Sequence, residues 1–68
     1  MDYYTKRMKA HSFIKDIINE AKGDIKIIDI CFMVDDRFGF GDSFTLKYLK
    51  ALKSMDFIII ENDKILKR

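Results

Sequence analysis

The chain is short enough that only one hydrophobic core can form. Of its 68 residues, 49% are hydrophobic and 35% are charged, and proline and tryptophan are absent. This composition is too hydrophobic for a disordered tail and too charged for a membrane span. A chain of this size buries only about 60% of the surface that its unfolded form exposes. We therefore expect a single domain over residues 1–68, and a binding module rather than an enzyme with a deep pocket.

The lone cysteine and the absence of long apolar runs indicate the cellular compartment that we expect for this protein. Cys31 has no partner for a disulfide within the chain, which is typical of reducing compartments. No signal-peptide stretch begins the chain, and the longest apolar run, residues 30–34, is far shorter than the ~20 residues that span a bilayer. We expect a cytoplasmic protein with no membrane partner.

Charge is segregated along the chain although the net charge is only +2. Residues 1–22 hold five basic and three acidic groups, residues 23–42 hold two and five, and residues 43–68 hold six and three. The last third is therefore the most basic, which indicates an anionic partner for it.

Residues 3–22 repeat at helical spacing. Asp2 is a suitable N-cap, and Gly23 stands where a left-handed glycine ends a helix. The apolar face of this helix comprises Tyr3, Ala10, Ile14, Ile17, Ile18 and Ala21, with Phe13 at its flank.

Residues 24–42 allow two interpretations. In the first, β-branched residues 25–28 form a short strand and a helix then begins with Asp29 as its N-cap. In the second, residues 25–34 form one buried strand, because their apolar residues also alternate. The first is favoured because residues 35–37 extend a helix naturally. Its core stripe comprises Ile27, Cys31, Val34 and Phe38.

A turn at residues 39–42 leads into another helix. Gly39 and Gly41 permit the positive φ angles of a tight reversal, and Asp42 or Ser43 then caps a helix over residues 44–55. A polar and basic stripe runs from Ser43 along one side of it. The opposite, apolar face comprises Thr45, Tyr48, Leu49, Leu52 and Met55.

The remaining residues predict a hairpin. Residues 57–60 and 64–67 have the composition of strands, and residues 61–63 between them are typical of a hairpin turn, because Asn and Asp tolerate left-handed conformations.

This order of elements resembles the winged helix-turn-helix domain. Val34, Phe38, Gly39 and Phe40 are similar to its signature, in which two apolar residues precede a turn glycine and one follows it. The resemblance spans the whole chain and extends to small winged-helix transcription regulators of archaea and their viruses. It implies an α+β fold with three helices, a short strand after the first helix and a C-terminal hairpin wing.

The later residues extend the resemblance and also depart from it. Residues 49–58 are similar to the end of a recognition helix entering the first wing strand, where the family often has glycine at the position of Asp56. Asp35 replaces the small residue usual in the second helix. The apolar positions after the turn fall on Thr45 and Tyr48 or, with a turn one residue longer, on Leu46 and Leu49.

The resemblance implies a sequence-specific double-stranded DNA-binding protein that regulates transcription by occupying a promoter, in a nucleoid or an infected host cell. Its third helix would enter the major groove, and its wing would neutralise phosphates nearby. A lysine stripe can also be only a solvated helix face. The implied DNA contacts are Ser43, Lys47, Lys50, Lys53, Ser54, Lys64, Lys67 and Arg68.

Exposed apolar residues suggest a homodimer. In the helical interpretation Phe32 and Met33 point away from the core stripe, and with Tyr4, Met8 or Phe40 they could bury a dimer seam. The alternative is that the first helix covers them. A homodimer would suit two DNA half-sites.

An acidic patch supports a different function. Asp35, Asp36 and Asp42 would repel DNA, and with Phe32 and Met33 they could dock a basic partner. The alternative to DNA binding is thus a small protein-interaction module; a structural subunit of a larger particle is a further possibility. His11 and Cys31 lack the pattern of a catalytic or metal site, so we expect no enzyme activity, cofactor, metal or small-molecule substrate.

Overall fold

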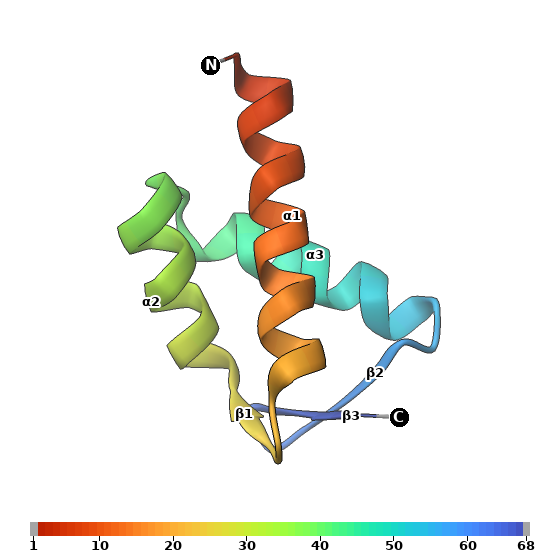
Figure 1. Cartoon of the computed structure of the whole chain (residues 1–68). Coiled ribbons are helices and arrows are strands. Elements are labelled where there is room, and N and C mark those ends of the chain that lie inside the picture. The colour runs from red at the N-terminus through yellow and green to blue at the C-terminus, as the bar shows by residue number, and fades with distance from the viewer. Residues whose placement is uncertain (1, 68) are drawn as a thin grey trace.

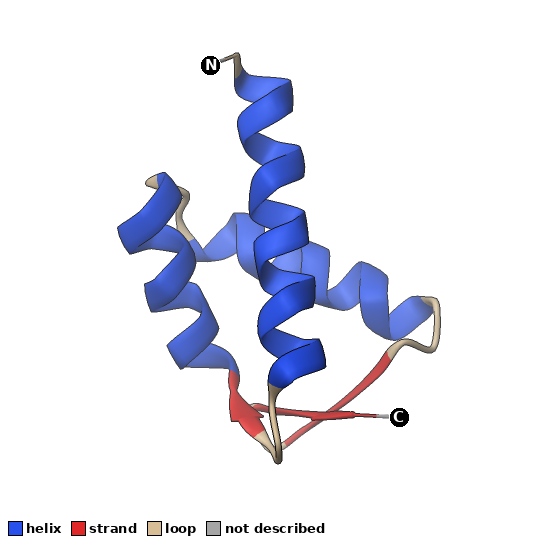
Figure 2. Ribbon diagram, in the orientation of Figure 1, coloured by secondary structure: helices blue, strands red, loops and turns tan. Residues whose placement is uncertain are grey.

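The computed structural model describes residues 2–67, in which three helices lie on one side of a three-stranded antiparallel sheet (Figures 1 and 2). The chain is therefore of the α+β class, as expected. Its elements are α1 (Tyr3–Glu20), β1 (Ile25–Lys26), α2 (Ile27–Phe38), α3 (Asp42–Ser54), β2 (Ile58–Glu61) and β3 (Lys64–Lys67).

The hairpin forms the larger part of the sheet. Strands β2 and β3 are antiparallel neighbours, and Glu61 of β2 pairs with Lys64 of β3 next to the turn. The two-residue strand β1 pairs with the other edge of β3, so the strand order is β1-β3-β2. Asn62 and Asp63 in the turn have φ angles of 51° and 60°. The predicted hairpin is confirmed, because both residues take the left-handed conformation that its tight turn requires.

The start of α1 agrees with the sequence and its end does not. The Thr5 backbone N–H donates to Asp2 Oδ1 at 2.8 Å, so Asp2 caps the helix. The helix ends at Glu20, and Ala21 is already extended, with φ −67° and ψ 139°. The prediction that a left-handed Gly23 ends this helix is therefore wrong. The chain turns directly toward β1 instead. Tyr3 is also exposed rather than part of the core.

Helix α2 begins earlier than predicted, and the single-strand interpretation of residues 25–34 is wrong. Asp29 lies in the first turn and not at the N-cap, which is Lys26. The reason is a long-range hydrogen bond: the Ile27 backbone N–H donates to the Asp63 carbonyl at 3.0 Å, so the hairpin turn fixes the point where β1 becomes helix. At the other end Gly39 has φ 73°, the left-handed conformation predicted for the turn glycine.

Helix α3 follows neither of the two registers completely, because Leu49 of the second register is buried whereas Tyr48 of the first is only partly buried. Thr45 is fully buried whereas Leu46 is 41% exposed. Neither Asp42 nor Ser43 caps the helix, because Gly41 is the N-cap and both residues lie inside the first turn. Met55 is 57% exposed and not part of the core, since the helix ends at Ser54.

All three helices and the sheet contribute to one core. Because each helix buries a single stripe, the outer faces of α2 and α3 are left for solvent or partners. The buried apolar residues are Ala10, Ile14, Ile18, Ile30, Cys31, Val34, Leu49, Leu52, Ile58 and Ile65.

Candidate nucleic-acid interface

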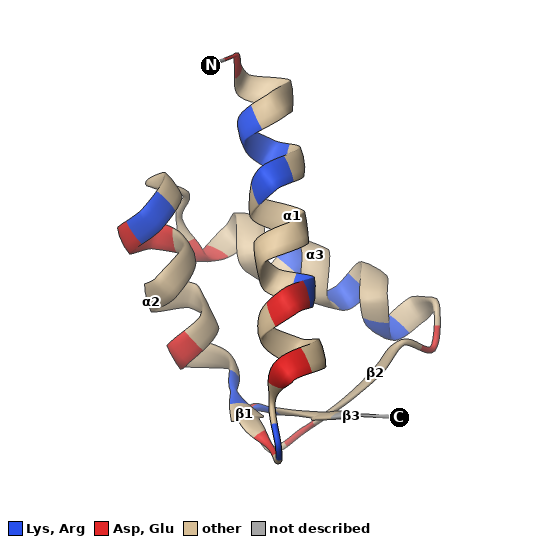
Figure 3. Ribbon diagram, in the orientation of Figure 1, with Lys and Arg blue, Asp and Glu red and all other residues tan. Residues whose placement is uncertain are grey.

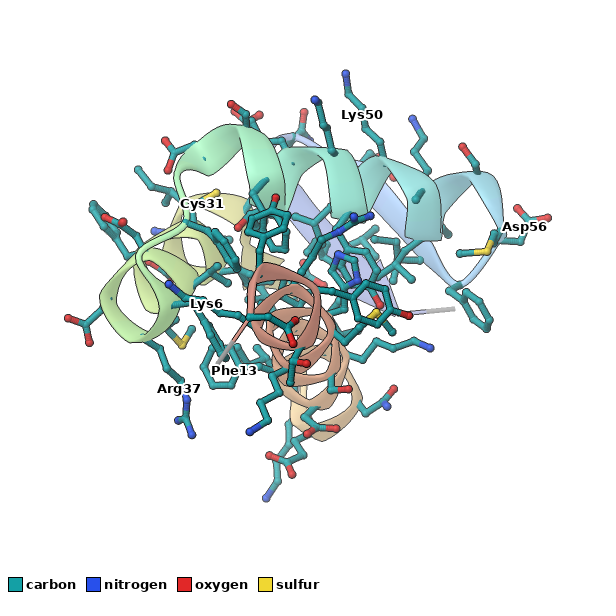
Figure 4. All side chains as sticks on the ribbon, turned by 90° about the horizontal axis from the view of Figure 1, so that it is seen from above. Lys6, Phe13, Cys31, Arg37, Lys50 and Asp56 are labelled. Carbon is teal, nitrogen blue, oxygen red and sulfur yellow. The ribbon has the colours of Figure 1, made fainter. Side chains whose placement is uncertain are left out.

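The outer face of α3 carries the candidate contacts. Ser43, Lys47, Lys50 and Ser54 are all exposed, as is Lys53 at their flank. No Asp or Glu occurs between residues 43 and 55, so the stripe is basic over nearly the whole helix. Figure 4 shows Lys50 pointing away from α1, on the side of α3 opposite the core.

The hairpin turn lies beside the first turns of α3. Asn62, Asp63 and Lys64 line one groove together with Asp42 and Leu46 of α3. The structure therefore brings the exposed Lys64 to the same region as α3, but next to two carboxylates.

Two of the implied wing contacts, Lys67 and Arg68, have side chains that the structure does not describe. Arg68 and the side chain of Lys67 lie outside the part of the chain that the structure describes.

Two basic residues that sequence reasoning missed adjoin these positions. Lys26 on the edge strand β1 is the direct cross-strand partner of Lys64 on the central strand β3, so the sheet presents two exposed ammonium groups side by side. Arg7 on α1 lines a cleft that also contains Lys47. The pairing of β1 with β3 and the packing of α1 against α3 are long-range features. A lysine in a predicted strand was the only sequence signal for Lys26.

The cleft between α1 and α3 has a volume of about 670 Å³ and an aromatic lining. The rings of His11 and Tyr48 are stacked, with centroids 3.9 Å apart and planes at 8°, and His11 also stacks on Phe44 at 5.3 Å. Burial, followed by the charge of Arg7, lowers the pKa of His11, and burial raises the pKa of Tyr48. The lining residues are Tyr3, Arg7, His11, Phe44, Lys47, Tyr48 and Ala51.

The outer face of α2 has the opposite chemistry. Ile28 and Phe32, one turn apart, are 58% and 66% exposed, and Met33 is exposed beside them. The first helix therefore does not cover Phe32, which was one of the two alternatives. Asp35 and Asp36 at the end of the same helix are exposed as well.

Two further candidates for a dimer seam, Tyr4 and Met8, are exposed on α1. Met8 lines a groove between α1 and α2 together with Phe13 and Arg37, whose guanidinium lies 4.9 Å from the centre of the Phe13 ring. In Figure 4 Arg37 points away from α3. Tyr4, Met8, Phe32 and Met33 are thus accessible, but they are divided between two helices. Phe40, the remaining seam candidate, is only partly exposed and stacks on Phe44 with ring centroids 4.2 Å apart.

Charge is also segregated in space. Figure 3 shows most of the basic residues of α1 in its first half (Lys6, Arg7 and Lys9), whereas its second half holds Lys15 together with the acidic Asp16 and Glu20. Helix α3 is basic along its length after Asp42. The carboxylates of residues 35 and 36 lie at the C-terminal end of α2, next to the turn that leads into α3. Of the basic residues of α1, Arg7 adjoins α3, because it lines the cleft that also contains Lys47, whereas Lys9 lines the groove between α1 and α2.

The residues considered for chemistry are not assembled into a site. His11 lines the α1–α3 cleft, whereas Cys31 is buried and borders the groove between α2, α3 and the hairpin. Burial, with a smaller contribution from Asp42, raises the pKa of the Cys31 thiol. Within residues 2–67 no group of three or more histidine, cysteine or acidic side chains is placed to hold a metal ion.

Comparisons with known proteins give no further assignment. No protein-family model matches the chain, and searches of curated proteins and of solved structures find no match. None of the described helices has both the length and the apolar character needed to cross a membrane.

Proposed function

We propose that this chain is a winged-helix domain that binds double-stranded DNA and regulates transcription by occupying a promoter. The observation that carries the proposal is the outer face of α3, where Lys47, Lys50 and Lys53 are exposed on a segment free of carboxylates from residue 43 to residue 55. Such a stripe attracts phosphates and leaves hydroxyl and ammonium donors for base edges.

The arrangement of the other elements supports the proposal. The sheet order β1-β3-β2, the left-handed Gly39 between α2 and α3, and the left-handed Asp56 before β2 suit a helix-turn-helix followed by a hairpin wing. Asp56 has φ 62° at the position where the resembled family often has glycine. These features give α3 a fixed orientation relative to the hairpin.

In this mechanism α3 lies in the major groove, which is about 12 Å wide and admits one helix. Lys47 and Lys50 are about one turn apart, so both reach the same stretch of groove, with Ser43 and Ser54 at its ends. Lys26 and Lys64 on the sheet neutralise phosphates beside it.

A homodimer completes the proposal. Exposed Tyr4, Met8, Phe32 and Met33 provide apolar area for a second copy, and a twofold dimer would read two half-sites of a palindromic operator. The protein would then act where DNA is accessible, in a nucleoid or in an infected host cell.

A second candidate function is favoured by the outer face of α2. Phe32 and Ile28 form an exposed apolar strip beside Asp29, Asp35 and Asp36. This chemistry suits a partner protein with a basic, apolar surface. A domain of this kind would be an adaptor that does not bind DNA.

The two functions differ in their dependence on Lys47 and Lys50. Binding to a labelled random-sequence duplex is measured by fluorescence anisotropy over a series of salt concentrations. Each phosphate contact contributes about 0.9 to the slope of log affinity against log salt, so Lys47→Ala/Lys50→Ala should flatten the slope by about 1.8. An adaptor that uses α2 would not respond to this change.

The matched control is Lys9→Ala/Lys22→Ala, which removes the same charge from exposed positions outside α3. We expect its slope to stay within about 0.5 of the unmodified protein. If the two double variants reduced the slope of log affinity against log salt equally, the binding would be a non-specific attraction to net charge, which would contradict the proposal. Absence of binding at low salt would transfer the assignment to the adaptor function.

A further inference from the structure

The cleft between α1 and α3 combines flat aromatic surfaces with two cationic side chains. It lies at the flank of α3, beside the outer stripe described above, and shares only Lys47 with it. Its volume of about 670 Å³ falls within the range of roughly 300–1,000 Å³ that is usual for small-molecule sites.

The aromatic surfaces are held in place by one another. His11 stacks on Tyr48 at 3.9 Å and on Phe44 at 5.3 Å. Phe44 stacks in turn on Phe40 at 4.2 Å, and Tyr3 meets Phe40 edge to face at 5.8 Å. Rings fixed in this way on two helices and the turn lose little freedom when a further planar ring packs against them.

The charges around the rings favour an anion. Arg7 on α1 and Lys47 on α3 line the cleft from opposite helices, and none of its described lining residues is acidic. A guanidinium can donate two parallel hydrogen bonds to a phosphate, and a lysine adds a mobile point charge. The lowered pKa of His11 favours a neutral ring, which leaves Arg7 and Lys47 as the lining groups that carry positive charge.

We propose that this cleft binds a nucleoside monophosphate, with the base packed against the His11–Tyr48 rings and the phosphate between Arg7 and Lys47. A nucleotide supplies both features that the lining selects, a planar ring and a compact double negative charge. The same chemistry occurs in a free nucleotide and at the end of a nucleic-acid strand, and the experiment below distinguishes these two sources. The proposal goes beyond DNA binding and does not depend on it.

The test is a titration of the whole chain with AMP, followed by ¹H–¹⁵N NMR spectra and without duplex DNA. We expect saturable shifts at the backbone amides of residues 7, 11, 44, 47 and 48. Adenosine, which lacks the phosphate, and inorganic phosphate, which lacks the ring, should each bind at least about tenfold more weakly. A pentanucleotide is the arm that represents a nucleic-acid strand.

Two variants test the cleft itself. Arg7→Gln should weaken AMP binding by about tenfold, because it removes a charged donor. Ala51→Glu places a carboxylate among the lining residues and should also weaken AMP binding by about tenfold. Both residues are exposed, so neither change disturbs the core. The control is Lys9→Gln, which removes one charge on the α1–α2 side and should leave AMP affinity unchanged.

Several results would overturn the proposal. AMP shifts confined to residues outside the cleft, or an affinity that Arg7→Gln and Ala51→Glu leave unchanged, would exclude this site. Equal binding of AMP, adenosine and phosphate would remove the need for a joint ring and phosphate contact. A pentanucleotide that binds more tightly than AMP would reassign the cleft to a nucleic-acid strand. None of these results depends on whether α3 binds duplex DNA.

Discussion

Helices α2 and α3 adjoin in sequence and share one core, yet their outer faces are opposite in chemistry. Each buries a single stripe, with Ile30 and Val34 on α2 and Leu49 and Leu52 on α3. The outer face of α3 is polar and basic, whereas that of α2 exposes Phe32 beside carboxylates. Because the core requires only the inner stripes, the difference between the outer faces points to different partners.

Exposed apolar area distinguishes α2 most clearly. A small chain gains little in folding from a phenylalanine that remains two-thirds exposed to solvent, and such residues commonly mark contact sites. The exposed face of α3 instead offers the donors that phosphates and base edges accept. The two helices therefore suggest one surface for protein contact and one for nucleic acid on the same domain.

The largest expected effect separates the two faces of α2. Ile30→Ala removes a fully buried side chain and should lower the free energy of unfolding by about 2–5 kcal/mol. Phe32→Ala, on the same helix, should change it by no more than about 0.5 kcal/mol. Urea denaturation followed by circular dichroism measures both.

A destabilisation by Phe32→Ala comparable to that of Ile30→Ala would contradict the assignment of Phe32 to the outer surface. If Phe32→Ala leaves stability unchanged but reduces self-association in analytical ultracentrifugation, the proposed dimer seam is strengthened.

An intermediate effect concerns the inner face of α3. Thr45 is fully buried, and its hydroxyl oxygen has no hydrogen-bond partner among the described residues. Thr45→Val keeps the shape and removes the unsatisfied group, so thermal unfolding should show a stability gain of about 1 kcal/mol. DNA affinity should stay the same, because the change lies on the inner face. A loss of stability would indicate that the hydroxyl has a partner, such as a buried water.

The smallest effect is a pH dependence at the contact of α1 with α3. Burial and then Arg7 lower the pKa of His11 in the folded chain, and Tyr3, Lys47 and Tyr48 are the other titratable groups lining its cleft. The unfolded chain, with a histidine pKa of about 6.5, therefore binds more protons. This contribution to stability is fully present above pH ~6.5, declines as pH falls through that value and levels off below the folded pKa.

Urea denaturation at several pH values tests this contribution, with His11→Asn as the variant that lacks the titrating group. The two chains should differ in their pH dependence only in this window. Identical profiles, or an NMR titration that places the His11 pKa above 6.5, would contradict it.

Periodicity predicted the parts of the fold that depend on local burial. The stripes of α1 and α3 follow from apolar spacing, and Gly39 and the Asn62–Asp63 turn follow from backbone sterics. The starts of α2 and α3 were displaced from the predicted caps. For α2, the contact of Ile27 with Asp63 joins residues far apart in the chain, which no local pattern records.

The residues of the candidate site could be predicted from the sequence only where they depend on local spacing, as in the fold. The exposed lysines of α3 follow from the stripe, whereas the aromatic cleft depends on how α1 crosses α3. His11 was considered from the sequence only as a catalytic or metal-ligating residue, because nothing local indicates that its ring stacks on Tyr48. The pairing of Lys26 with Lys64 likewise requires knowledge of the sheet order.

The most direct test of the contrast between α2 and α3 is an NMR titration of the chain with a short DNA duplex at low salt. The account predicts shifts and broadening at the amides of residues 43–54, with smaller changes at residues 26 and 64. Residues 28–36 on α2 should remain unchanged at the first equivalents of DNA. Perturbation centred on α2, or no perturbation of α3 at saturation, would contradict the assignment of α3 as the nucleic-acid surface.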